Sequence, residues 1–353
     1  MNDDLTLTAN GRSISGWEEI SVTLRAEAFP NVFTIGLSSL DPSSGVDLVV
    51  RPGDACQVKL GSDVVITGYV DRVGNGGSPT AHALRVIGRG KCQDLVDCSA
   101  EWPKGQIKGA SALEIAKKLA QPYGIAVQLA NGAKPGPEVP QFNLTYGETA
   151  AEIIQRVARA AALLAYEDAN GILNLAAVGT RQAASGIIYG ENVESWDDEL
   201  SMDQRYSEIV CTALSQDVWG DLGDGGLFFD TEKDPNVPRH RRMYMVLEEA
   251  ATGAQPFTIA KAKWEMARRA GRATMVQATV DSWRDKSGTL WAPNSLVPVA
   301  LPGFPASSSP LCISEVTFRR DNSGTHADLV LYPPAAFSPE PISLQPVNLN
   351  GIV

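Results

Sequence analysis

The chain has 353 residues, of which 44% are hydrophobic and 20% charged, and its formal net charge is −11 at pH 7. This globular composition provides enough apolar material for two or three domains. The negative charge argues against a general DNA-binding protein, because such proteins neutralise phosphates with Lys and Arg. No apolar run approaches the ~20 residues that span a bilayer. The start of the chain also lacks a signal-peptide pattern, so we expect a protein made in the cytosol without stable membrane insertion.

Residues 1–100 are predicted to form a β-barrel-like domain. Apolar residues alternate with other residues there, at the period of two that is typical of strands. The alternation is seen at Leu5 and Leu7, at Ile20, Val22 and Leu24, and at Phe33, Ile35 and Leu37. Turn pairs such as Asn10-Gly11 and Pro52-Gly53 separate these stretches, at the spacing expected of a sandwich or barrel.

Residues 101–179 are predicted to form a small α/β module. Thr149 and Glu152 fit a capping box, in which a hydroxyl and a carboxylate bond to N–H groups that the first helical turn leaves unpaired. The apolar residues that follow form one helical stripe: Ala150, Ile153, Ile154, Val157, Ala158, Ala161 and Leu164. Residues 163–166 and 172–176 then read as a hairpin with Asn170-Gly171 in its turn, and residues 111–120 repeat the helix pattern earlier in the chain.

Residues 180–337 are predicted to form a second β-barrel-like domain. Strand patterns occur at 187–189, 208–214, 273–283, 297–301, 311–318 and 327–332. Between them we expect a long polar loop at 220–242 and a helix at 258–271, which Gly271 ends. The Pro-rich end of the chain, including the tail at 338–353, is predicted to be extended. The expected fold is α+β and mostly β, with two similar β-barrel-like domains flanking a helix-plus-hairpin module.

A weak internal similarity links the two β regions. RPGDACQVKL at 51–60 resembles APNSLVPVAL at 292–301, and TAHALRVI at 80–87 resembles GTHADLVLY at 324–332. A further strand lies between the two segments in each half, VITGYVDRV in the first and LCISEVTFR in the second. Either alternating strands with Gly/Pro turns match by chance, or the chain contains two β-domains of one kind.

The sequence contains no recognisable catalytic or metal-binding motif. No G-x-S-x-G, H-E-x-x-H or P-loop occurs, the five cysteines lie far apart, and His82, His240 and His326 have no second ligand at metal spacing. The acidic groups at 167–168, 191–194 and 197–199 suit solvated positions better than a carboxylate pair across a cleft. We therefore expect no catalytic residues, no cofactor, no metal and no enzymatic activity.

Two polar stretches suggest contacts rather than chemistry. Residues 221–226, DLGDGG, have a calcium-like composition without the full spacing of an EF-hand, so a flexible loop is the simpler interpretation. Arg239-His240-Arg241-Arg242 is the one basic run. Arg239, Arg241 and Arg242 are our candidate interface residues for an acidic partner, and a solvated loop end is the alternative.

Several segments in order along the chain carry a family resemblance. GWEEISVTLRAEAFPNVFTIGLS (16–38), ITGYVDRV (66–73), GETAAEIIQRVARAAALLAYEDANGILNL (147–175) and ISEVTFRRDNSGTHADLVLYPPAAF (313–337) resemble the baseplate central hub of Mu-like contractile phage tails, of the late-control-D type. The resemblance extends over nearly the whole chain, and its segments are structural signatures.

The resemblance implies a structural protein of the virion tail baseplate that is assembled in the bacterial cytoplasm. It implies a homotrimeric ring that joins the hexameric tail tube, other baseplate proteins and a trimeric membrane-piercing spike. Two similar β-domains in each of three subunits would present six units to the tube. DNA would pass through the lumen without specific binding. A tail-associated cell-wall hydrolase is one alternative, and a carbohydrate-binding β-protein with exposed Trp196, Trp219, Trp283 and Trp291 is the other.

Overall fold

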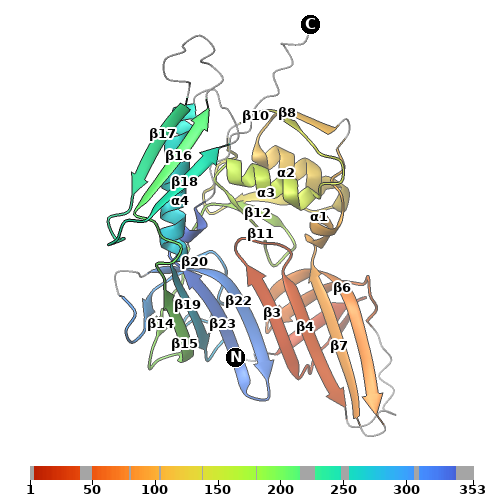
Figure 1. Ribbon diagram of the computed structural model, residues 1–353. Helices are drawn as coiled ribbons and strands as arrows, with labels where there is room; N and C mark the ends of the chain where they lie inside the picture. The colour runs from red at the N-terminus through yellow and green to blue at the C-terminus, as the bar shows by residue number, and fades with distance from the viewer. Residues whose placement is uncertain are drawn as a thin grey trace.

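β-Strands, most of them antiparallel, are the main secondary structure of this computed structural model, which describes residues 4–39, 50–78, 81–102, 105–136, 138–179, 181–214, 227–247, 254–305 and 310–338. Thirteen of the strands belong to one sheet. Figure 1 shows this sheet as a broad lower layer, with two smaller parts of the chain above it. The predicted mostly β, α+β fold is confirmed.

The first half of the large sheet is built from the N-terminal residues. It comprises β1 (Leu5–Ala9), β2 (Arg12–Ile14), β3 (Glu19–Arg25), β4 (Val32–Ser39), β5 (Ala55–Leu60), β6 (Asp63–Ser78) and β7 (Ala81–Gly90). The strands lie in the order β3-β4-β7-β6-β5-β1-β2. Leu5, Leu7, Ile20, Val22 and Ile35 are all buried, as their alternation in the sequence predicts.

The second half of the sheet repeats this strand order. It comprises β13 (Arg181–Gln182), β15 (Val193–Leu200), β19 (Thr274–Val280), β20 (Ser295–Val297), β22 (Leu311–Asp321) and β23 (Gly324–Tyr332), with β14 (Ile187–Ile188) pairing separately with β21 (Val299–Ala300). The order β15-β19-β23-β22-β20 corresponds to β3-β4-β7-β6-β5. The β6–β7 and β22–β23 hairpins each contain a bulge, at Asp71 and at Ser314. The internal similarity in the sequence therefore corresponds to a repeated topology.

The two halves, which we predicted to be β-barrel-like domains, are open sheets and do not close into barrels. β22 pairs with β3 in antiparallel register, from Glu315 opposite Arg25 to Arg320 opposite Ile20, so the halves join into one sheet. A single cluster of buried apolar residues extends across both halves. Alternating apolar residues identify strands, but closure depends on tilt and register, which that pattern does not determine.

The predicted α/β module is confirmed in its main elements. It contains α1 (Gln93–Asp97), β8 (Gln106–Ala110), α2 (Ala112–Ala120), a short 3-10 turn η2 (Gln121–Tyr123), β9 (Val127–Ala130), β10 (Val139–Asn143), α3 (Ala150–Ala160), β11 (Leu164–Glu167) and β12 (Leu173–Ala176). Both capping boxes form, Ser111 with Glu114 and Thr149 with Glu152. β11 and β12 form the predicted hairpin, and β9 adds to β12 in parallel.

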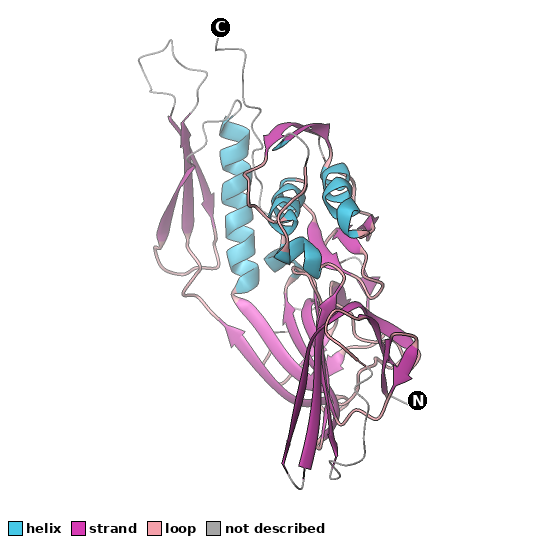
Figure 2. Cartoon of the chain, turned by 90° about the vertical axis from the view of Figure 1, so that its right-hand side faces the viewer, coloured by secondary structure: helices cyan, strands magenta, loops and turns pink. Residues whose placement is uncertain are grey.

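A separate layer rises from the second half of the sheet. β16 (Glu208–Leu214) pairs with β17 (Leu227–Lys233) and with β18 (Arg242–Leu247), and α4 (Ala254–Arg272) packs along these strands. Figure 2 shows α4 standing between the three strands and the module. The prediction of one loop over 220–242 is wrong at 227–233, because β17 forms there, while 220–226 lie outside the described residues. No helix in the described ranges is long and apolar enough to cross a bilayer.

The Pro-rich segment near the C-terminus is packed against α4 as far as the structure describes it. The 3-10 turn η4 (Pro334–Phe337) buries Ala336 and Phe337, and Trp264 Nε1 donates a hydrogen bond to the carbonyl oxygen of Ser338 at 2.6 Å. Our prediction that this stretch is extended and unpacked is therefore wrong for residues 334–337. Residues 339–353 of the predicted tail lie outside the described residues.

The apolar stripe of α3 provides a test of the module's packing. Ile154 is fully buried within the module's core. Ile154→Asp would place an unpaired carboxylate there, and we expect the free energy of unfolding to fall by at least about 3 kcal/mol. Gln155→Asp, which adds the same charge to the half-buried neighbouring position, is the control and should cost much less. Denaturant unfolding measures both, and equal stability of the two variants would contradict the assigned facing of α3.

Candidate assembly interface

The acidic residues at 194–199 lie on an edge strand. β15 is the last strand of the large sheet, and β19 pairs with one of its sides. Glu194, Asp197 and Glu199 are exposed on it, and Leu200 at its end is 55% exposed. An exposed strand edge has unpaired N–H and C=O groups that can pair with another chain, and acidic side chains restrain such pairing. The sequence prediction treated these acids only as solvated residues.

A second open edge lies on β6. β5 pairs with β6 only from Asp63 to Tyr69, whereas β7 pairs with the other side from Gly68 to Ser78. From Arg72 to Gly77, no described strand pairs with the side of β6 that faces away from β7. Figure 1 shows β15 at the left of the large sheet and β6 at the right. Among the described residues, β15 and the part of β6 from Arg72 to Gly77 are therefore open strand edges, and they lie far apart on the large sheet.

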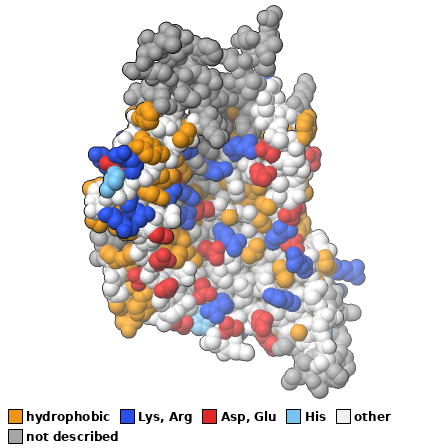
Figure 3. Space-filling model, viewed as in Figure 1, with side chains coloured by type: hydrophobic (Ala, Val, Ile, Leu, Met, Phe, Trp, Pro, Cys, Tyr) orange, Lys and Arg blue, Asp and Glu red, His pale blue; other side chains and the backbone are white. Residues whose placement is uncertain are grey.

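A third exposed surface is the outer face of β16, β17 and β18. Phe229, Tyr244 and Val246 are exposed there, and Val246 is the most exposed of them at 74%. Figure 3 shows apolar side chains gathered over this region, next to a group of Lys and Arg side chains. An exposed apolar surface rimmed by charge is typical of a site for protein contact.

The three predicted interface arginines border this surface but differ in their surroundings. Arg239 is exposed. Arg241 donates to the carbonyl oxygen of Asp203 at 2.6 Å and lies over the ring of Tyr206, so it holds the local loop. Arg242 Nε donates to Glu208 Oε2 at 2.8 Å, and this hydrogen bond holds the pKa of Glu208 below its usual value. Arg239 and Arg242 are therefore exposed, whereas Arg241 is held against the local loop.

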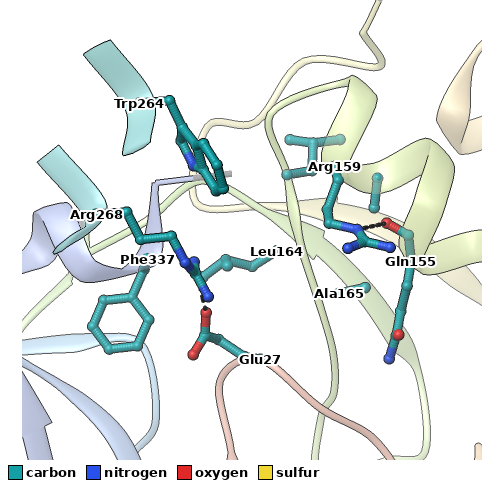
Figure 4. Close-up of a pocket in the computed structure, with 10 residues that line it drawn as sticks. Glu27, Gln155, Arg159, Leu164, Ala165, Trp264, Arg268 and Phe337 are labelled. Carbon is teal, nitrogen blue, oxygen red and sulfur yellow. Dashed lines mark hydrogen bonds and ion pairs between the residues drawn. The ribbon is translucent and has the colours of Figure 1, made fainter. Parts of the chain in front are cut away.

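A hollow lies where the large sheet, the module and α4 meet. Figure 4 shows Glu27 beneath Arg268 of α4, with Trp264 above and Arg159 of α3 on the opposite side. Arg268 Nη1 lies 3.9 Å from Glu27 Oε1, and Arg272 also forms an ion pair with Glu27. These ion pairs join the large sheet to α4, which suits a structural junction.

Glu167 at the end of β11 connects the module to the large sheet. It is only 3% exposed. Its Oε2 accepts from the Asn31 backbone N–H at 2.9 Å and its Oε1 from the Cys92 N–H at 2.8 Å, while Asn31 Nδ2 donates to the Glu167 carbonyl oxygen. Burial raises the pKa of this carboxyl from 4.5 to about 7, although the backbone N–H groups oppose the rise. The carboxylate is enclosed by protein, which fits a structural role.

The other residues considered for chemistry do not converge on one site. Glu191 pairs with Lys286, and Glu194 Oε2 lies 2.7 Å from His326 Nδ1. Trp283 and Trp291 are buried in the core, Trp196 is half-buried against Tyr189, and Trp219 lies outside the described residues. The exposed tryptophan cluster expected of a carbohydrate-binding protein is therefore not formed by Trp283 and Trp291. The described residues hold no cluster of three or more His, Cys, Asp or Glu side chains suited to a metal.

Comparison with family models matches three successive parts of the chain. Residues 4–90 match the Mu phage baseplate assembly protein GpP-like N-terminal domain, residues 92–177 the second domain of baseplate hub protein gp44-like proteins, and residues 255–340 the fourth domain of Mu phage baseplate assembly protein GpP. The first two matches cover β1 to β7 and the α/β module. The third begins at α4.

Whole-chain comparisons agree with these matches. The baseplate hub protein gp44 of Escherichia phage Mu is 30% identical over 345 residues, which is 96% of this chain and 89% of that protein. The crystal structure of the prophage MuSo2 43 kDa tail protein from Shewanella oneidensis superposes with a TM-score of 0.83 at 29% identity, over 95% of this chain and 99% of that one. The tail protein from Neisseria meningitidis MC58 shares the fold, with a TM-score of 0.77 at 23% identity over 95% and 98% of the two chains.

These findings define a phage tail protein of the baseplate hub class. The chain belongs to the Mu-like baseplate hub family, as its segments at 16–38, 66–73, 147–175 and 313–337 had indicated. None of the matched families is described as an enzyme.

The raised pKa of Glu167 predicts a pH-dependent stability. Between pH 4.5 and about 7 the folded protein holds a proton that the unfolded chain releases, so this group's contribution to stability falls as the pH rises. We expect a loss of about 3 kcal/mol across that window from this carboxyl alone. Glu167→Gln removes the titrating carboxyl. The glutamine would also point its amide NH₂ at the backbone N–H of either Asn31 or Cys92, so the substitution should destabilise the protein.

Denaturant unfolding of both proteins from about pH 5 to about pH 8 tests this prediction. The difference in unfolding free energy between the wild type and Glu167→Gln should shrink as the pH rises. A difference that stays constant with pH would show that this carboxyl does not titrate in the window.

Proposed function

We propose that this chain forms a homotrimeric ring that joins the hexameric tail tube to the trimeric membrane-piercing spike of a Mu-like phage or prophage. The observation that carries the proposal is the repeated strand order within one chain. Three chains with two equivalent half-sheets each present six similar units around an axis, while their other parts occur three times. Such a ring matches a six-fold partner on one side and a three-fold partner on the other.

The proposed ring assigns roles to the parts of the chain. The half-sheets within 1–100 and 180–337 surround the axis, and the module within 101–179 and the α4 layer project from one side of them, as in Figure 1. DNA passes through the lumen without specific binding, in keeping with the net charge of −11. Arg239 and the exposed face of β16 to β18 contact the spike, the tube or another baseplate protein.

The role we propose is structural and without enzymatic activity. The candidate acids at 167–168, 191–194 and 197–199 are paired with Lys, His or backbone groups or lie on an edge strand, and no nucleophile and base are brought together among them. We propose that the protein assembles in the bacterial cytoplasm and then remains in the virion baseplate. Digestion of purified cell wall by the protein, abolished by substitution of one carboxylate pair, would establish the hydrolase alternative instead.

The mass of the purified protein tests the ring. Light scattering should give three times the chain mass, and a ring that buries roughly 2,000 Å² or more at each interface should keep this mass on dilution. Averaged electron micrographs viewed down the axis should show six similar lobes around a central opening. A monomer at micromolar concentration would refute the proposal that the chain forms the ring by itself.

A further inference from the structure

The two open edges, on β6 and β15, correspond to the two strands that pair inside the chain, β22 and β3. In the second half, β20 pairs with β22 as far as Cys312, and β3 then pairs with the same side of β22 from Glu315 onward. In the first half, β5 pairs with β6 as far as Tyr69, and no described strand pairs with the same side of β6 from Arg72 to Gly77. The bulges at Asp71 and Ser314 make these positions equivalent. The unpaired edge of β6 is therefore equivalent to the edge of β22 that pairs with β3.

In the second half, β15 has the position that β3 has in the first half, but no strand corresponding to β22 pairs with its outer side among the described residues. β15 pairs with β19 as β3 pairs with β4. The outer side of β3 pairs with β22, whereas the outer side of β15 has only one isolated bridge, between Tyr189 and Val193, among the described residues. One junction, between β22 and β3, is therefore complete within the chain. The two strands of an equivalent second junction, β6 and β15, lie at opposite ends of the sheet and do not meet within one chain.

We propose that the edge of β6 in one copy of the chain pairs with the edge of β15 in the next copy, in the antiparallel register of the β22–β3 junction. The proposal rests on the trimeric ring proposed above and assigns its subunit interface. The open edges lie at opposite ends of the sheet in Figure 1, so each copy offers one edge to each neighbour. Such head-to-tail contacts generate a closed ring when the rotation between copies closes.

The existing junction determines the register of the proposed one. The paired residues of the two halves can be matched strand by strand. In this matching, Val73 of β6 corresponds to Val316 of β22, and Leu200 of β15 corresponds to Leu24 of β3. Val316 lies opposite Leu24. Val73 of one copy therefore lies opposite Leu200 of the next.

This register also accounts for the exposure of Leu200. Leu24 packs against the apolar core, as does Val73, whereas Leu200 is 55% exposed in the isolated chain. In the proposed pairing Leu200 extends the core face of the neighbouring sheet, so the edge residue loses its contact with water.

The opposite face of the sheet brings opposite charges together. In the β22–β3 junction, Arg25 Nε donates to Glu315 Oε2 at 2.7 Å. In the proposed junction, Glu199 lies opposite Gly74, and the exposed Arg85 of β7 lies directly across Gly74 on its other side. Because Gly74 has no side chain, Arg85 can reach Glu199 over it, and long side chains interact at such spacings. The acidic residues of β15 would then serve as partners for basic residues on the neighbour.

Paired cysteines test the register directly. Directly opposed residues have Cβ atoms about 4.5–5.5 Å apart, close enough for a disulfide with small adjustments. We expect Val73→Cys combined with Leu200→Cys to give covalent dimers and trimers on mild oxidation, seen on a non-reducing gel. Each single variant should remain monomeric on that gel, which also controls for the five native cysteines. Val73→Cys with Asp198→Cys, displaced by two positions on the same face, is the register control and should cross-link far less.

The outcomes separate this inference from the proposed ring. A protein that sizes as a trimer but gives no cross-link from the matched pair, or more from the register control, would refute the β6–β15 junction and leave the ring standing. A protein that sizes as a monomer would refute both.

A charge exchange provides an independent measurement. Arg85→Glu or Glu199→Arg alone should shift the trimer towards monomer at low micromolar concentration, because each places like charges across Gly74. The double variant Arg85→Glu with Glu199→Arg should restore the trimer, whereas a purely additive loss would refute the contact. Lys108→Glu, at an exposed position of the α/β module away from both edges, should leave the mass unchanged.

Discussion

The buried carboxylate of Glu167 is the contact on which the arrangement of the parts depends. Its oxygens accept hydrogen bonds from the backbone N–H groups of Asn31, just before β4, and Cys92, just after β7. It therefore joins the ends of two neighbouring strands of the large sheet to the hairpin of the module. Gly90 leaves the space for it, since a Cβ there would lie 1.9 Å from Glu167 Oε2. An unpaired carboxylate at this depth would be very costly, and its hydrogen bonds restrict the module to one position on the sheet.

Much of the local structure could be predicted because its causes are local. The capping boxes at Ser111 and Thr149, the stripe of α3 and the hairpin at 164–176 each depend on residues within a few positions of one another. Strands with alternating Val, Ile and Leu were located for the same reason. The repeated order of the two half-sheets was also accessible, because both copies keep strands of similar apolar pattern between Gly/Pro turns.

The missed features have causes that lie far away in the sequence. β15, with the sequence VESWDDEL, has an acidic composition that disfavours a strand, and β19 and the edge position make it one. β17 is a strand because β16 pairs with it, and η4 packs because α4 offers Trp264 and Arg268. Glu167 looked like one of several adjacent acids, and only the approach of Asn31 and Cys92 shows its role.

The pairing of β3 with β22 has a consequence for the order in which the protein can fold. Thr23 and Thr317, whose hydroxyl groups lie 2.9 Å apart across this pair, are 294 positions apart in the chain. During synthesis β3 can pair with β4 at once, but its other side remains open until nearly the whole chain has emerged. Contacts of such large sequence separation form slowly, and open strand edges are prone to wrong pairing in the meantime. Unlike β15, β3 has few acidic residues to prevent such pairing, with Glu19 as its only one. The pairing in the middle of the finished sheet therefore forms late, and the open side of β3 is exposed to wrong pairing during translation.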